Sequence, residues 1–125
     1  MRASRSFSHH PESVGAARRF TTEALAGVTP DVRDAVELMV SELATNCIRH
    51  TGAAFELTIV LAGGQVRIEV TDRAGGTPTM RWPGPEEPTG RGLQIVNLLS
   101  EAWGVEELAA TGKTVWFTIA AASAA

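Results

Sequence analysis

The fold is decided at residues 30–50, PDVRDAVELMVSELATNCIRH, and at residues 55–72, FELTIVLAGGQVRIEVTD. In the first stretch apolar residues return every three or four positions, which predicts an amphipathic helix. In the second stretch apolar and polar residues alternate on both sides of Gly63-Gly64, which predicts a β-hairpin. The helix has an apolar stripe of Val32, Val36, Met39, Leu43 and Cys47, widened by Val40 and Ala44. The change of period marks where a helical layer gives way to a sheet.

Further elements are predicted on both sides of this unit. They are an edge strand at Arg2–Phe7, a helix from an N-cap at Ser13 through Ala26, a long lid-like loop at Arg73–Thr89, a helix from Gly92 to Glu101 with Leu93, Val96 and Leu99 facing inward, and strands at Trp103–Leu108 and Thr114–Ala120. Because the strands arrive in hairpins, we expect an α+β fold, a two-layer α/β sandwich with helices on one face of a mainly antiparallel, partly mixed sheet. Residues 1–125 are expected to form a single domain, with about ten N-terminal and about five C-terminal residues peripheral.

Composition excludes several classes of function. The formal net charge of −3 argues against a sequence-independent grip on nucleic acid, which needs a basic face. No run approaches the roughly 20 apolar residues of a membrane span, and no apolar run follows the basic start, so a cytoplasmic protein without membrane contact is expected. Cys47 is the single cysteine, which excludes an intrachain disulfide and a cysteine zinc cluster. We expect it to be a small core residue.

Three polar residues border the apolar stripe of the long helix. Glu42, Asn46 and His50 follow one another at four-residue spacing, so they share one ridge. Polar groups at the margin of a core face suggest a pocket wall that meets a charge or a metal ion. The alternative is that all three are simply solvated.

Two other motifs suit nucleotide chemistry. Gly90-Arg91-Gly92 opens a predicted helix, where backbone N–H groups and the helix dipole favour a phosphate; the alternative is an ordinary turn. Asp72 ends a strand shortly before Gly75-Gly76. Its carboxylate can accept a hydrogen bond from an exocyclic amine while the glycines admit a flat ring; the alternative is an Asx turn.

The order of these motifs along the chain resembles that of a known protein family. The motifs are Ser41-Glu-Leu-Ala-Thr-Asn46, Asp72 with Gly75-Gly76, Gly90-Arg-Gly92-Leu93, and Gly112-Lys-Thr-Val-Trp116. Together they resemble the successive boxes of the Bergerat-type ATP-binding fold, which DNA gyrase, sensor histidine kinases and anti-sigma factors share. Within that superfamily the chain most resembles the short, single-domain anti-sigma regulatory factors with serine-kinase activity. The likeness runs from about Pro11 to Ile119.

The resemblance implies ATP and Mg²⁺ as cofactors and assigns roles to residues. Asn46 matches the Mg²⁺ ligand, Glu42 the catalytic acid that orients or deprotonates the attacking hydroxyl, and Asp72 the acceptor of the adenine amine. The other nucleotide contacts that it implies are Gly75, Gly76, Gly90, Arg91, Gly92, Leu93 and Thr114. One departure is that the first glycine after Asp72 comes one residue later than in the commonest pattern, Asp-x-Gly-x-Gly.

The function implied is that of an ATP-binding anti-sigma regulatory factor. Such proteins phosphorylate a serine on a STAS-type anti-anti-sigma partner, sequester a sigma factor and act as homodimers, without direct contact to nucleic acid. The alternative is a nucleotide-binding regulatory module without phosphotransfer, and the retained Glu42 favours the kinase. An ATP-binding domain of a sensor histidine kinase is disfavoured, because no phosphoacceptor-histidine helix pair precedes the motifs.

Overall fold

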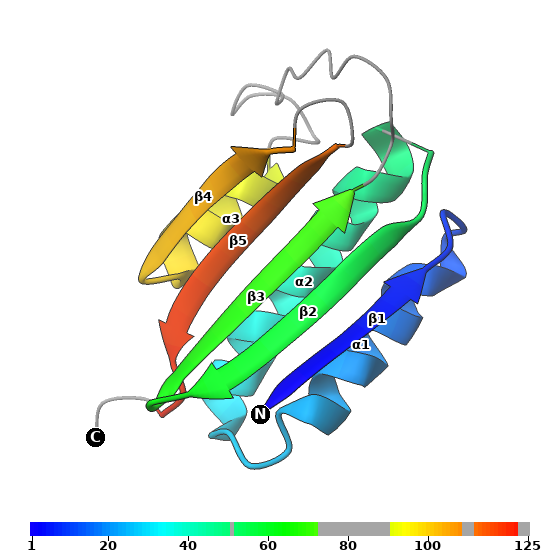
Figure 1. Ribbon diagram of the computed structural model, residues 1–125. Coiled ribbons are helices and arrows are strands. Elements are labelled where there is room, and N and C mark those ends of the chain that lie inside the picture. The colour runs from blue at the N-terminus through cyan, green and yellow to red at the C-terminus, as the bar shows by residue number, and fades with distance from the viewer. Residues whose placement is uncertain (51, 73–90, 109–111, 123–125) are drawn as a thin grey trace.

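Five strands form one sheet and three helices cover one of its faces in the computed structural model, which describes residues 1–50, 52–72, 91–108 and 112–122 (Figure 1). The strands are β1 (Arg2–Phe7), β2 (Phe55–Ala62), β3 (Gln65–Asp72), β4 (Ala102–Glu107) and β5 (Lys113–Ala120). The helices are α1 (Glu12–Ala24), α2 (Pro30–His50) and α3 (Arg91–Leu99). The predicted two-layer α+β architecture is confirmed.

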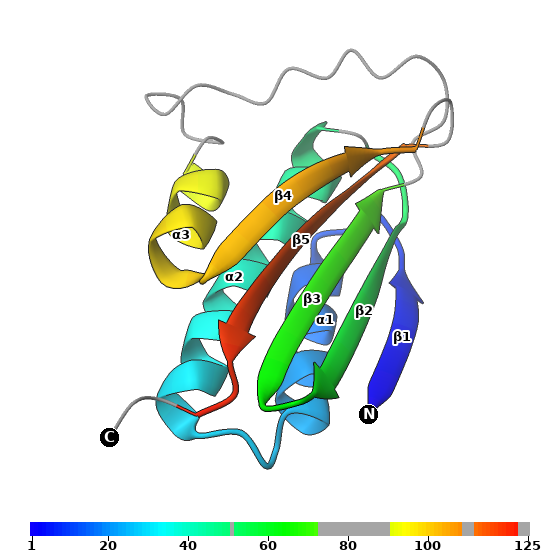
Figure 2. The same ribbon diagram turned by 60° about the vertical axis from the view of Figure 1, so that its left-hand side comes forward.

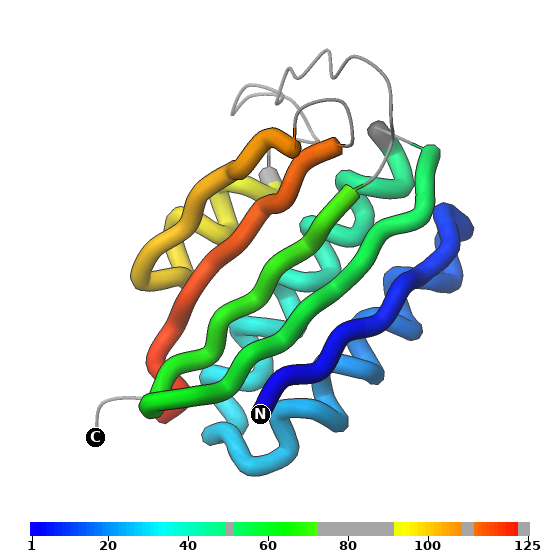
Figure 3. The backbone as a smooth tube through the Cα atoms, viewed as in Figure 1, coloured from blue at the N-terminus to red at the C-terminus, as the bar shows by residue number. Residues whose placement is uncertain are grey.

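The strands follow the order β1-β2-β3-β5-β4 across the sheet, as the backbone tube shows (Figure 3). Each neighbouring pair in this order is antiparallel. The parallel pairing expected of a partly mixed sheet is therefore absent from the described strands. The two long connections run from β1 to β2, through α1 and α2, and from β3 to β4, through α3.

The β2–β3 hairpin forms where the alternating pattern predicts it. Ala62 pairs with Gln65, which leaves Gly63 and Gly64 as a two-residue turn. Their φ angles are 60° and 75°. A turn with positive φ at both central positions matches the twist of the flanking strands and favours glycine.

Helix α2 lies between α1 and α3 and packs its apolar stripe on the sheet (Figure 2). The predicted stripe is buried throughout: Val32, Val36, Met39, Val40, Leu43, Ala44 and Cys47. Because α3 lies along one flank of α2, polar residues at that margin face a neighbouring helix rather than open solvent.

The predicted helices differ from the structure at their ends and on one face. Helix α1 ends at Ala24 rather than Ala26, and α3 spans Arg91–Leu99 rather than Gly92–Glu101. Helix α1 begins at Glu12 with Pro11 at the N-cap, so Ser13 lies inside the helix, where its hydroxyl is 3.0 Å from that of Ser8. The φ that proline fixes already suits a helix start. Leu99 is 38% exposed, so the prediction that it faces inward is wrong. The residues of α3 that pack on the core are Leu93, Ile95 and Val96.

Four chain segments meet at one end of the molecule. The C-terminal ends of α2 and β3 and the N-terminal ends of α3 and β5 lie together there, whereas Met1 and the β2–β3 turn lie at the opposite end (Figures 1 and 2). This end therefore gathers most of the described candidate residues. None of the described helices combines the length and the apolar character that a membrane crossing needs.

Candidate functional site

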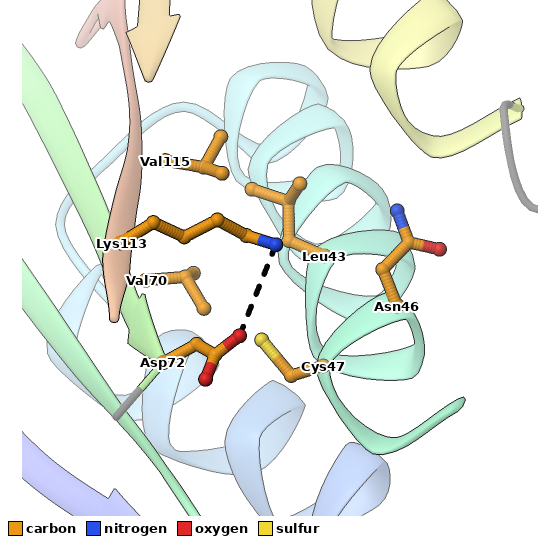
Figure 4. Close-up of a pocket in the computed structure, with 7 residues that line it drawn as sticks. All are labelled: Leu43, Asn46, Cys47, Val70, Asp72, Lys113 and Val115. Carbon is orange, nitrogen blue, oxygen red and sulfur yellow. Dashed lines mark ion pairs between the residues drawn. The ribbon is translucent and has the colours of Figure 1, made fainter. Parts of the chain in front are cut away.

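A small pocket lies between the C-terminal half of α2 and the ends of β3 and β5 (Figure 4). Its lining residues are Leu43, Asn46, Cys47, Val70, Asp72, Lys113 and Val115. The free space is about 10 Å³, which is about the room for one water molecule. A nucleobase needs more room than this and enters only if the lining side chains move.

An ion pair stands at the sheet side of the pocket. Asp72, the last residue of β3, and Lys113, the first of β5, are register partners and project from the same face of the sheet. Their exposed fractions are 3% and 8%, and Lys113 Nζ is 3.8 Å from Asp72 Oδ2 (Figure 4). Burial lowers the pKa of the Lys113 ammonium below its usual range, and the neighbouring Asp72 carboxylate limits that drop.

Cys47 forms part of the opposite wall. Burial, reinforced by the negative charge of Asp72, raises the pKa of its thiol to about 12. The thiol is therefore protonated at neutral pH. Cys47 acts as a small, weakly polar wall residue, in agreement with its place in the predicted apolar stripe.

The structure places Thr114 away from this pocket. Thr114 Oγ1 is 2.8 Å from Thr71 Oγ1, and both residues project from the face of the sheet opposite to Asp72 and Lys113, since side chains alternate along a strand. Lys113, and not Thr114, therefore lines this pocket, and a contact of Thr114 with the nucleotide stays a prediction. The signal was present in the sequence. Counting back by two from the inward-facing Phe117 and Val115 leads to Lys113.

A second feature is the contact between α2 and the first turn of α3. Asn46 is only 6% exposed, and its Nδ2 atom is buried without a hydrogen-bond partner in the described part of the chain. A Cβ atom added to Gly92 would lie 2.7 Å from Asn46 Nδ2 and 3.5 Å from Glu42 Cβ. The helices approach so closely that glycine alone fits at position 92 without a shift.

This arrangement suits a polar ligand. A buried polar atom left without a partner costs roughly 1–3 kcal/mol, and the N-terminal end of a helix carries a positive partial charge. The Asn46 carboxamide also offers an oxygen of the kind that Mg²⁺ accepts beside phosphates and water. The residues present at the α2–α3 junction therefore fit a Mg²⁺-bound phosphate group.

The pocket and the junction share one residue. Asn46 lines the pocket, yet its carboxamide points away from the Asp72–Lys113 pair and toward the side where α3 lies (Figure 4). Glu42 precedes it by one helical turn on the same ridge. The structure thus brings Glu42, Asn46, Asp72 and Gly92 to adjoining parts of one region.

The remaining predicted residues are placed less completely. Gly75, Gly76 and Gly90 lie outside the described residues, as does the whole of the predicted lid. Arg91 is the first residue of α3, and His50 is the last of α2. Leu93 is half-buried and packs on the core rather than lining the pocket.

The chain is similar to a known protein family and to a solved structure. A family model described as "Histidine kinase-like ATPase domain" matches residues 7–119. Among solved structures, the histidine kinase domain of the blue-light activated histidine kinase from Erythrobacter litoralis EL346 is similar, with a TM-score of 0.59 and 20% sequence identity. The match covers 89% of this chain and 60% of that one, so this chain spans only part of the matched structure's length. No curated protein matches the chain.

At this identity the structural likeness concerns the fold alone. The family model, in contrast, covers the sequence from the end of β1 to the penultimate residue of β5, and an ATPase domain implies ATP binding. This chain belongs to the histidine kinase-like ATPase domain family.

Proposed function

We propose that this chain binds Mg²⁺-ATP with the adenine in the Asp72 pocket and the phosphates at the α2–α3 junction. The observation that supports the proposal most strongly is that Asn46 belongs both to the pocket and to the α2–α3 junction. This residue lines the pocket, and its Nδ2 atom lies 2.7 Å from the place of a Cβ atom on Gly92. A nucleotide has the same two-ended character, with a flat base at one end and anionic phosphates at the other.

Each end of the proposed site has side chains that suit the corresponding end of the nucleotide. Leu43, Val70 and Val115 provide apolar walls for a ring, and the Asp72 carboxylate accepts a hydrogen bond from the adenine amine. At the other end, the Asn46 carboxamide oxygen would hold Mg²⁺, and the first turn of α3 faces the phosphates. Bound Mg²⁺ would neutralise charge that develops on the transferred phosphoryl group.

We further propose that the chain is an anti-sigma regulatory factor. In this function it phosphorylates a serine of a STAS-type anti-anti-sigma partner, sequesters a sigma factor and acts as a homodimer. The support is the resemblance of the motifs together with the position of Glu42, one turn before Asn46 and beside Gly92. A carboxylate at that place can orient or deprotonate a hydroxyl that attacks the terminal phosphate.

Phosphotransfer from ATP labelled at the γ-phosphate tests this function. The parent protein is incubated with Mg²⁺, labelled ATP and candidate STAS-type proteins, and label on a serine of one of them is the expected result. Glu42→Gln should retain ATP binding and lose transfer. Asp34→Asn is the matched control, since Asp34 is an exposed acid on the same helix, and it should transfer label at the parental rate.

The outcomes separate the two functions. Transfer at the parental rate by Glu42→Gln would overturn the role of Glu42. Capture of a sigma factor by a parent protein that binds ATP and transfers no label would identify the chain as a nucleotide-binding regulatory module without kinase activity.

A further inference from the structure

Lys113 is the single lysine of the chain, and it is buried. Lysine is almost never fully buried unless its charge is paired. Its partner Asp72 is the residue proposed to accept the adenine amine, so the cation stands beside the proposed base-binding group. The ammonium and the carboxylate both project into the pocket from neighbouring strands (Figure 4).

The distance between the two charges is longer than that of a direct hydrogen bond. Lys113 Nζ and Asp72 Oδ2 are 3.8 Å apart, whereas a charge-assisted hydrogen bond measures about 2.7–2.9 Å. A ligand atom can therefore approach both side chains without first breaking a short bond between them. The free space already present, about 10 Å³, adjoins this pair.

The chemistry of the pair matches one edge of a base. A carboxylate only accepts hydrogen bonds and an ammonium only donates them. Adenine presents an amine, which donates, with a ring nitrogen that accepts on either side of it: N1 on one side and N7 on the other. The two side chains together are complementary to the amine and one of these nitrogens.

We propose that Lys113 is a base-reading residue that donates a hydrogen bond to the ring nitrogen next to the amine held by Asp72. The inference rests on the proposed binding of ATP and deepens it. The apolar walls formed by Leu43, Val70 and Val115 exclude water around this contact. Burial also lowers the pKa of Lys113, so its ammonium gains from any acceptor that replaces lost hydration.

Deaza analogues of ATP test the proposal at the level of single atoms. In 1-deaza-ATP and 7-deaza-ATP a C–H group replaces one of the two ring nitrogens, so the analogue lacks one acceptor. The affinities of ATP and both analogues are measured by calorimetry for the parent and for Lys113→Met, which keeps a long apolar stem and removes the charge. The parent should bind one of the analogues about 10- to 100-fold more weakly than ATP, as expected for a hydrogen bond to a charged group.

In Lys113→Met the ratio of ATP affinity to that analogue's affinity should fall close to one. The ratio is informative because a general loss of stability, or the exposure of an unpaired Asp72, weakens ATP and its analogues alike. Lys113→Arg, which retains a cationic donor, should restore at least part of the discrimination. Thr118→Ser serves as the control from the other face of the sheet, since Thr118 is a buried residue of β5 outside the pocket lining, and it should keep the parental ratio.

Two results would overturn the inference. One is a parent that binds ATP and both analogues equally well, and the other is a ratio that stays the same in Lys113→Met. In both cases ATP binding itself would stand. A parent that binds no ATP would overturn the proposed function as well, so the two failures are distinguishable.

Discussion

Replacing Gly92 by alanine should disturb the site through a single methyl group. The added Cβ would lie 2.7 Å from Asn46 Nδ2, whereas ordinary contacts of this kind begin at 3.4 Å. Overpacking of this sort typically costs about 1–3 kcal/mol. It is offset by the gain of about 0.5–1 kcal/mol that alanine brings to a helix relative to glycine. The free energy of unfolding should therefore fall by up to about 2.5 kcal/mol if Asn46 keeps its place.

The clash can also be relieved if the Asn46 side chain rotates. Stability is then retained, but the carboxamide leaves the α2–α3 junction and Mg²⁺-ATP should bind about tenfold more weakly or worse. Either the stability or the affinity must change. Urea unfolding and calorimetric titration with Mg²⁺-ATP, performed on the same preparation, measure both quantities.

Gly15→Ala is the matched control. Gly15 lies in α1, and a Cβ there would meet only Arg19 Nη1, at 3.4 Å. This variant should be about 0.5–1 kcal/mol more stable than the parent and should bind Mg²⁺-ATP with parental affinity. If Gly92→Ala behaved in the same way, the close contact between α3 and Asn46 would be refuted.

Three further predictions concern the pocket and the sheet. Cys47 should react with iodoacetamide at pH 8 at least about 1000-fold more slowly in the native protein than in urea, because raising the thiol pKa from 9.0 to about 12 lowers the thiolate fraction by that factor; comparable rates would contradict its burial. The free energy of unfolding should fall as the pH rises from 9 toward 12, because the folded protein keeps the Cys47 proton that the unfolded chain releases. Below pH 10.5 the lowered pKa of Lys113 makes the free energy of unfolding rise with pH, which opposes the effect of Cys47. The measurement therefore compares the parent with Cys47→Ala, whose free energy of unfolding should lack the decline due to Cys47. Thr114→Val should cost about 1 kcal/mol in urea unfolding, since it breaks the bond to Thr71; a marked loss of ATP affinity would support a contact of Thr114 with the nucleotide, and an unchanged affinity would contradict that contact.

Local periodicity predicted the parts of the fold that depend on it. The stripe from Val32 to Cys47 and the alternation around Gly63-Gly64 each lie within one element, so the sequence alone reveals which side is buried. The helix ends were less predictable. Ser13 is a common capping residue, yet the preceding proline begins the helix, and Leu99 continues the apolar spacing one position away from the packed face.

The site depends on relations between elements, and these are harder to predict. Asp72 and Asn46 follow from the motif resemblance. The choice of Lys113 over Thr114 depends on the strand register, and the contact of Gly92 with Asn46 depends on how α3 packs on α2. A glycine motif indicates backbone freedom, but the sequence does not state which side chain lies opposite the missing methyl group.

The central claim is that Asn46 joins a base pocket to a phosphate site. The most direct test is calorimetric titration of ATP, with and without Mg²⁺, into the parent, Asn46→Ala and Asp72→Ala. The parent should bind more tightly with Mg²⁺, and Asn46→Ala should lose that dependence. Asp72→Ala, which has no side-chain acceptor, should keep the Mg²⁺ dependence while losing its preference for ATP over purine riboside triphosphate, which lacks the amine. Full Mg²⁺ dependence in Asn46→Ala would contradict the account.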